Sequence, residues 1–244
     1  MRREVQGVLL ILIGGALVRL SLSGAYKNYV KPGIGPYLTA AGVVLALLGL
    51  WSVLRDDTLS RRRAPAAASH TDEMARADDI DGHRDAGPRI AWLLLLPVLT
   101  IFVVAPPPLG AFAAGRGTSS VPPPAAALPA LKGDPTDLDV VEFVVRAVWD
   151  DEETLKGHRV RMTGFVTEAP GGGWYLTRMM ISCCAADAQP FMIKTVAAPP
   201  FPADTWVQLV GEWVPGGGTH RSDAIPLIKV ESVVKVQQPA NPYE

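Results

Sequence analysis

Three long uncharged segments constrain this chain more than any other feature of its sequence. They cover residues 5–25, interrupted only by Arg19, then residues 37–54 and residues 90–114. A helix that crosses the hydrocarbon core of a bilayer needs about 20 mostly apolar residues, and an arginine near a helix end can extend its side chain to the interface. The sequence therefore predicts a membrane domain at residues 1–114, with helices at about 5–25, 37–54 and 90–105.

The first two helices are expected to form a hairpin, because a short turn-rich connection separates them. Three consecutive prolines starting at Pro106 should end the third helix near residue 105. A cleaved signal peptide is the alternative interpretation of the first segment. Arg2 and Arg3 precede its apolar run, and Ser23-Gly24-Ala25 resembles a small-residue cleavage site.

Basic residues predict the orientation of these helices. Two arginines precede the first helix and seven lie in the loop at residues 55–89, whereas the connection between the first two helices carries only two lysines. Cytoplasmic loops carry the excess of lysine and arginine. We therefore expect a multi-pass protein of the cell membrane, with a cytoplasmic N-terminus, a cytoplasmic loop at 55–89 and an extracytoplasmic C-terminal domain.

The rest of the chain divides into a linker, a domain and a short tail. Residues 115–135 are rich in Pro, Ala and Gly, which predicts an extended tether that is not a packed element. Residues 136–238 are expected to form one β domain that begins with a helix, and residues 239–244 a tail. In the predicted helix, valines from Val141 to Val148 recur at helical spacing, and Asp137 is the candidate N-cap.

Beyond residue 157 the apolar pattern alternates with a period of two, which is typical of strands. Strands are expected at residues 158–167, 174–182, 191–196, 205–214 and 227–236. Five strands in so short a region favour a closed barrel, because closure removes exposed strand edges. The expected fold is thus a helical membrane hairpin plus a third transmembrane helix, followed by a small OB-like barrel in which Gly164 and Gly211 provide tight bends.

Cys183 and Cys184 are the only cysteines of the chain, and they are adjacent. An ordinary structural disulfide is excluded, because neighbouring Cα atoms are only about 3.8 Å apart. Two small buried residues, a strained vicinal disulfide and two ligands for a soft metal all remain open. Apolar neighbours such as Met179 and Ile181 favour the first. We expect a largely buried, reduced pair that shapes the crossing between the second and third strands.

A metal site would need ligands beyond the two thiolates. His158 and His220 are the only histidines of the β domain, and both lie in or beside predicted turns. With Cys183 and Cys184 they are weak metal candidates, because the ligand spacings common in zinc sites are absent. The sequence implies no cofactor.

Two charged residues accompany the cysteine pair. Asp187 is expected to cap a helical turn, and Arg178, on the second strand, is expected to pair with a carboxylate such as Asp187. Contact with a ligand is the alternative role for both residues. Neither is predicted to be catalytic. The net charge of -1 and the lack of basic residues among the aromatic residues of the domain exclude nucleic acid as a partner.

Three features together resemble the YcgQ-like family of two-component permease subunits. They are the N-terminal hairpin, residues 177–188 with their Cys-Cys-Ala-Ala-Asp-Ala core, and residues 206–213. The resemblance implies a partner that is a large polytopic permease and, for some members, handling of a metal or metalloid. The central loop of the family is often rich in histidine, whereas here it holds only His70 and His83. The resemblance brings no catalytic residue and marks Cys183, Cys184 and Asp187 as signature positions.

These observations predict a non-enzymatic accessory subunit of a membrane permease that handles a metal or metalloid species. Three helices offer few walls for a transport path, and ionisable groups along them are sparse. One alternative is an extracytoplasmic thiol or redox enzyme using Cys183 and Cys184, which requires an accessible cysteine of low pKa. The other is an OB-type module that binds a saccharide or peptide.

Overall fold

The computed structural model describes residues 3–62, 96, 107–151 and 153–244. The chain forms two compact units: a helical unit of Met1–Tyr26 and Gly33–Pro106, and a barrel unit of Lys27–Pro32 and Pro107–Glu244. The third membrane helix predicted at 90–105 falls, apart from Leu96, outside the described residues. The same holds for the predicted loop beyond Arg62.

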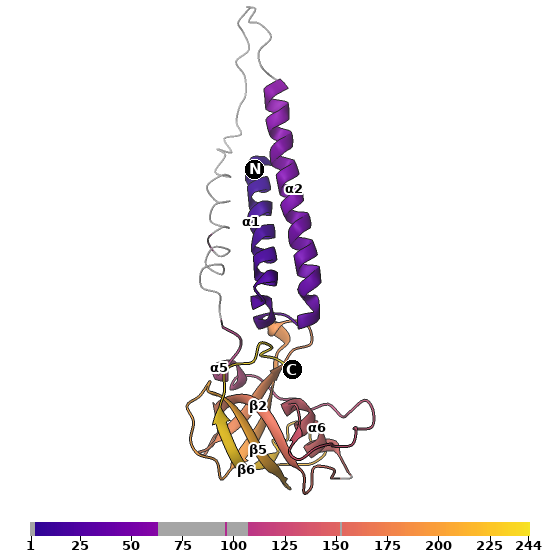
Figure 1. Cartoon of the computed structure of the whole chain (residues 1–244), viewed down its shortest axis with the longest axis vertical. Coiled ribbons are helices and arrows are strands. Elements are labelled where there is room, and N and C mark those ends of the chain that lie inside the picture. The colour runs from indigo at the N-terminus through magenta and orange to yellow at the C-terminus, as the bar shows by residue number, and fades with distance from the viewer. Residues whose placement is uncertain (1–2, 63–95, 97–106, 152) are drawn as a thin grey trace, which may run out of the picture. The chain divides into compact units, whose positions relative to one another are not determined.

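Two helices lie side by side in the helical unit, α1 (Arg3–Leu22) and α2 (Gly35–Arg62) (Figure 1). Short 3₁₀ turns at Ala25–Asn28 and Pro32–Ile34 connect them. Glycines let the two backbones approach closely, because a Cβ added at Gly42 would lie 2.8 Å from the carbonyl oxygen of Gly14. Close approach of this kind favours helix pairing in lipid, where no hydrophobic force draws helices together.

Among the described residues, one helical span is long and apolar enough to cross a membrane. It covers Pro32–Arg55, 24 residues with a mean hydropathy of 2.0, whereas the apolar part of α1 is shorter, Gln6–Leu22. Membrane anchors and signal sequences share this property. Helix α2 continues past the predicted end at residue 54, because leucine and arginine sustain a helix outside an apolar stretch as well as within it.

Five strands of the barrel unit close on themselves. They are β2 (Arg159–Glu168), β3 (Trp174–Met180), β4 (Gln189–Val196), β5 (Trp206–Val214) and β6 (Leu227–Lys235). The order around the barrel is β2-β3-β4-β6-β5 and back to β2, with β4 and β6 parallel and the other neighbours antiparallel. A two-residue strand, β1 (Thr136–Asp137), pairs with β2 in parallel. The predicted five-stranded barrel is confirmed, with mixed strand directions.

Gly211 marks a bend in this barrel. The pairing of β5 with β6 shifts register between Val210 and Gly211, and a Cβ at Gly211 would collide with the carbonyl oxygen of Lys229. A bulge that has no room for a side chain requires glycine. The strand therefore bends where the sequence predicts a tight bend.

Helix α6 (Val140–Trp149) packs against the barrel core. Its buried apolar side chains are Val140, Phe143, Val144, Ala147 and Val148. The buried face of the helix is rotated by about one residue from the predicted face. Val141 and Val145, which were predicted to be on that face, are only partly buried. Phe143 and Ala147 extend the apolar face beyond the valines alone.

The N-terminus of α6 is capped from a distant part of the chain. The Glu244 carboxylate accepts hydrogen bonds from the backbone N–H groups of Val140 (3.3 Å) and Val141 (2.8 Å). Asp137 was the predicted cap, and this prediction is wrong. Asp137 lies in β1, and its carboxylate pairs with Arg161 at 2.9 Å.

The segment predicted as a tail is packed on the barrel unit, and the mostly exposed segment predicted as a linker is anchored to that unit at Val121. Residues 115–135 contain no helix or strand, but Val121 within them is fully buried. The Val121 N–H donates to the Ser222 carbonyl, and its own carbonyl accepts from the Trp149 indole. In the predicted tail, Tyr243 is 1% exposed and bridges to Met179 of β3. Hydrogen bonds to distant segments therefore fix parts of the chain for which the composition predicts an extended conformation.

Candidate functional site

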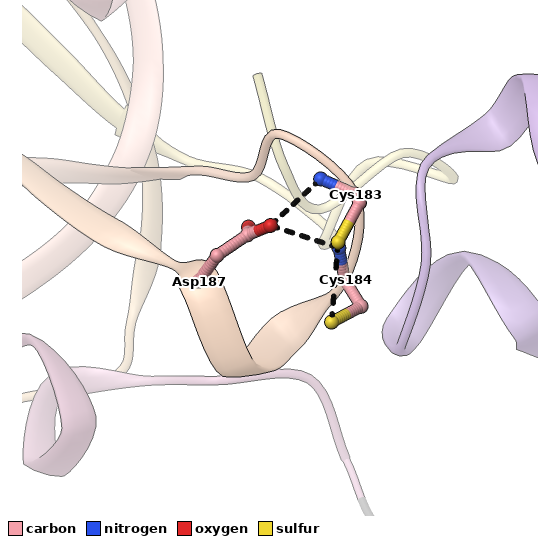
Figure 2. Close-up of side chains that lie close together, drawn as sticks. All are labelled: Cys183, Cys184 and Asp187. Atoms are coloured by element: carbon pink, nitrogen blue, oxygen red, sulfur yellow. Dashed lines mark hydrogen bonds between the residues drawn. The ribbon is translucent and has the colours of Figure 1, made fainter.

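The candidate site is the turn that follows β3 and carries both cysteines. Cys183 is exposed and Cys184 is partly buried, and their Sγ atoms lie 3.6 Å apart without a bond between them (Figure 2). The prediction of a largely buried pair is wrong. Met179 and Ile181 before the turn are buried among the residues of a small apolar cluster, whereas the chain turns outward from Ser182.

Asp187 organises this turn. Its Oδ1 accepts the backbone N–H of Ser182 at 2.9 Å, and its Oδ2 accepts those of Cys183 at 2.9 Å and Cys184 at 3.4 Å. The 3₁₀ turn Ala185–Asp187 brings the carboxylate back toward these donors, as Figure 2 shows for Cys183 and Cys184. The predicted capping role of Asp187 is therefore present.

The carboxylate also governs the ionisation of the neighbouring thiol. Hydrogen bonding of the Cys183 thiol to Asp187, followed by its interaction with Cys184, raises the pKa of Cys183 from 9.0 to about 12. The same contact with Cys183 and the backbone N–H groups lower the pKa of Asp187 to about 2. At neutral pH the turn therefore holds a carboxylate beside a protonated Cys183 thiol.

The connection between α1 and α2 braces one side of the turn. Val30 forms an antiparallel bridge with Cys184. The Lys31 N–H donates to the Cys183 carbonyl at 3.1 Å, and the Ala185 N–H donates to the Tyr29 carbonyl at 2.7 Å. The backbone of the cysteine turn is thus paired with Tyr29–Lys31, immediately before the membrane-length span that begins at Pro32.

The C-terminal residues brace the other side. The Glu244 N–H donates to the Met179 carbonyl at 3.0 Å, and the Ile181 N–H donates to the Glu244 carbonyl at 3.2 Å. The buried Tyr243 hydroxyl accepts the Leu109 N–H at 3.0 Å and donates to the Asn28 carbonyl at 2.8 Å. One hydroxyl therefore joins the segment after α1 to the segment that enters the barrel unit at Pro107.

The structure brings together only some of the predicted site residues. Arg178 pairs with Glu244 at 3.0 Å and not with Asp187, and its guanidinium carbon lies 5.0 Å from the Trp206 ring centroid. His220 is exposed and pairs with Asp151 at 3.0 Å. The one cluster of metal-ligand side chains in the described part of the chain comprises the two cysteines and Asp187, so His158 and His220 do not belong to it.

Sequence reasoning missed the braces, Tyr29–Lys31 and Tyr243. No local pattern identifies them, because the Tyr243 hydroxyl bonds a carbonyl 215 positions away in the chain. The position of Asp187, the third side chain of the cluster, could be anticipated from the sequence. An aspartate that follows a turn can accept the N–H groups of the preceding residues, which places its carboxylate beside their side chains.

We expect Cys183 to react slowly with thiol reagents although it is exposed. In a Cys184→Ser variant, which removes the second cause of the raised pKa and keeps Asp187, exchange with a neutral disulfide reagent at pH 8 should be slower than with a thiol of ordinary pKa, by at most roughly 30- to 50-fold. The thiolate fraction falls about a thousandfold over three pKa units, and higher nucleophilicity recovers only part of the rate.

Stopped-flow rates from pH 7 to 10 check this expectation, and the rate should still be rising at pH 10. Asp187→Asn should accelerate the reaction, because it removes the charge that disfavours the thiolate. A plateau below pH 8 would mean an activated thiolate, which is the signature of a thiol enzyme.

Comparisons with known proteins bear on the barrel unit. Residues 141–244 match the DUF1980 C-terminal domain family. The match includes the cysteine turn and both residues of the C-terminal brace, and it begins within α6, so the N-terminal helices lie outside it. No curated protein and no solved structure matches the chain.

Proposed function

We propose that this chain is a non-enzymatic accessory subunit of a membrane permease, with its barrel unit held at the outer surface of the bilayer. The proposal rests on the Tyr243 junction, which is the pair of hydrogen bonds that join the Tyr243 hydroxyl to Leu109 and Asn28. The connection between α1 and α2 and the segment that begins at Pro107 are fastened to the same hydroxyl, next to the cysteine turn. The barrel unit is thus attached to the membrane segments at two points of the chain.

The junction supports a multi-pass topology. Lys27–Pro32 is part of the barrel unit, so the connection between the helices and the barrel lie on the same side of the membrane. Once α2 has crossed the bilayer, the chain must return to that side before Leu109. A third crossing at about 90–105 provides the return. The arginine excess before α1 and after residue 54 favours a cytoplasmic location for the opposite side.

The electrostatics of the turn favour a binding role over catalysis by a thiol. A thiol enzyme needs a thiolate stabilised by positive charge. Here the raised pKa keeps Cys183 protonated at neutral pH, and the charged group that acts on its thiol is the Asp187 carboxylate. The rival function, a thiol or redox enzyme, draws support only from the exposure of Cys183.

The OB-like alternative draws support from a polar cavity outside the barrel. A cavity of about 260 Å³ lies beside the start of α6, and Arg161, Thr163, Gln208 and Glu142 are among its lining residues. Its ionisable side chains are largely paired with one another, as Arg161 is with Asp137. A ligand would have to displace these pairs, so we prefer the permease subunit.

Purification from mild detergent tests the proposal. The affinity tag belongs at the N-terminus, because Tyr243 and Glu244 are packed. We expect a polytopic protein to copurify in a fixed ratio, and we expect deletion of the chain to change cellular accumulation of a thiophilic metal or metalloid, measured by mass spectrometry.

A tagged, unrelated membrane protein of similar size is the control for nonspecific recovery. Protease added to intact cells should reach the barrel unit and leave an N-terminal tag protected. A chain that purifies alone, together with unchanged accumulation in the deletion strain, would contradict the proposal.

A further inference from the structure

We propose that Cys183, Cys184 and Asp187 form a capture site for one thiophilic divalent cation of the zinc and cadmium class, with one coordination position left open. The ligand atoms of the three side chains all lie within 4.8 Å of one another. Thiolate sulfur and carboxylate oxygen are both common zinc ligands. A single short turn supplies all three, so no rearrangement of distant segments is needed to assemble them.

The separation of the two sulfur atoms indicates which cations fit. With bonds of about 2.3 Å at a tetrahedral angle, two thiolates on one zinc ion lie about 3.8 Å apart, whereas a linear arrangement needs about 4.6 Å. The Sγ atoms of Cys183 and Cys184 lie 3.6 Å apart. The observed separation therefore suits a bent S–metal–S angle and disfavours an ion that prefers two-coordinate linear geometry.

Asp187 can offer a coordination position when the thiol beside it is deprotonated. An ionised carboxylate offers about four lone-pair directions. Three backbone N–H groups occupy three of these, one at Oδ1 and two at Oδ2, and the Cys183 thiol occupies the fourth. A cation that displaces the thiol proton frees that direction, while the backbone bonds fix the turn and limit the entropy lost on binding.

Binding replaces protons by the cation. Two S–H bonds break and two S–metal bonds form, the ionised carboxylate adds an oxygen–metal bond, and two protons pass to solvent. The net charge of a divalent complex with two thiolates and one carboxylate is minus one. Exposed Cys183 leaves a fourth position for water or for a ligand from another protein. Three protein ligands and an open position are typical of sites that exchange ligands, unlike closed structural zinc sites.

The position of the site matches its use by a transport partner. The turn is hydrogen-bonded to Lys31, one residue before the membrane-length span begins. A cation held there lies where the chain enters the bilayer, so it could pass to a permease that binds the helices. This use rests on the proposed function, whereas the binding itself does not.

Titration of the full-length, reduced protein in detergent tests the site, with Cd²⁺ alone as the probe. We expect thiolate-to-cadmium charge-transfer absorbance that saturates at one equivalent, and displacement of Cd²⁺ by Zn²⁺. Cys183→Ser with Cys184→Ser should weaken binding at least 100-fold. Asp187→Asn, which keeps one acceptor oxygen for the turn, should weaken it about 10- to 100-fold.

His220→Gln and His158→Gln serve as matched controls and should leave the affinity unchanged. Circular dichroism confirms that each variant is folded. Saturation by folded wild-type protein at other than one equivalent, or unchanged affinity in the double cysteine variant, would overturn the site. Unchanged affinity in Asp187→Asn would overturn the three-ligand assignment. A chain that binds Cd²⁺ but recovers no permease would refute only the proposed function, and recovery of a permease by a chain that does not bind Cd²⁺ would refute only the site.

Discussion

Gly14→Leu is expected to force α1 and α2 apart, whereas Gly15→Leu should leave their pairing intact. A Cβ at Gly14 would lie 2.5 Å from the Gly42 carbonyl oxygen and 2.7 Å from the Ala46 backbone nitrogen. Neither backbone atom can move aside without moving its helix. A Cβ at Gly15 meets no heavy atom within 4 Å. The two substitutions therefore add the same side chain to adjacent positions, one blocked and one open.

Overpacking typically costs about 1–3 kcal/mol, and a collision with backbone belongs at the upper end of that range. Spin labels on Val8→Cys and Leu50→Cys, both at exposed positions, would report the separation of the helices in a background with Cys183→Ser and Cys184→Ser. We expect a longer and broader distance distribution for Gly14→Leu only. The same distribution for Gly14→Leu as for the background would show that glycine contact does not determine the packing of these helices.

Local periodicity was sufficient to predict the strands of the barrel. In the first half of β2, buried Val160 and Met162 alternate with partly buried residues because one face of the strand lies on the core, whereas Gly164–Thr167 are buried on both faces. The strand order could not be derived in this way. The parallel pairing of β4 with β6 depends on contacts between residues far apart in the sequence, and hydrophobic pattern alone does not select the partner.

The site could be located but not assembled from the sequence. Adjacent cysteines identified the turn, yet their apolar neighbours suggested burial because composition does not reveal where the chain turns. The cysteines are not buried because they lie in a turn outside the barrel, where the Asp187 carboxylate accepts hydrogen bonds from three backbone N–H groups. The helix cap shows the same limit, since Glu244 reaches α6 from the far end of the chain.

Tyr243→Ala is expected to destabilise the barrel unit by about 3–5 kcal/mol, as for other buried aromatic side chains replaced by alanine. Tyr243 is 1% exposed and packs in a cluster with Ala114, Phe165, Met179 and Ile181. Tyr243→Phe keeps the ring and removes only the hydroxyl. It should cost about 1–2 kcal/mol, because the Leu109 N–H and the Asn28 carbonyl lose their partner. Urea unfolding followed by tryptophan fluorescence measures both changes.

Tyr175→Phe is the matched control for the hydroxyl. Tyr175 is a partly buried residue of β3, and within the described residues no hydrogen bond is formed by its hydroxyl, so the free energy of unfolding should change by less than about 0.5 kcal/mol. Hydrogen exchange separates a local role of Tyr243 from a global one. If the hydroxyl fastens the connection between the helices to the cysteine turn, Tyr243→Phe should accelerate exchange at the Lys31 and Ala185 amides more than in the core of β2. Equal acceleration throughout the barrel would mean that Tyr243 stabilises the fold without fastening the junction, and the argument for a two-point attachment to the membrane segments would fail with it.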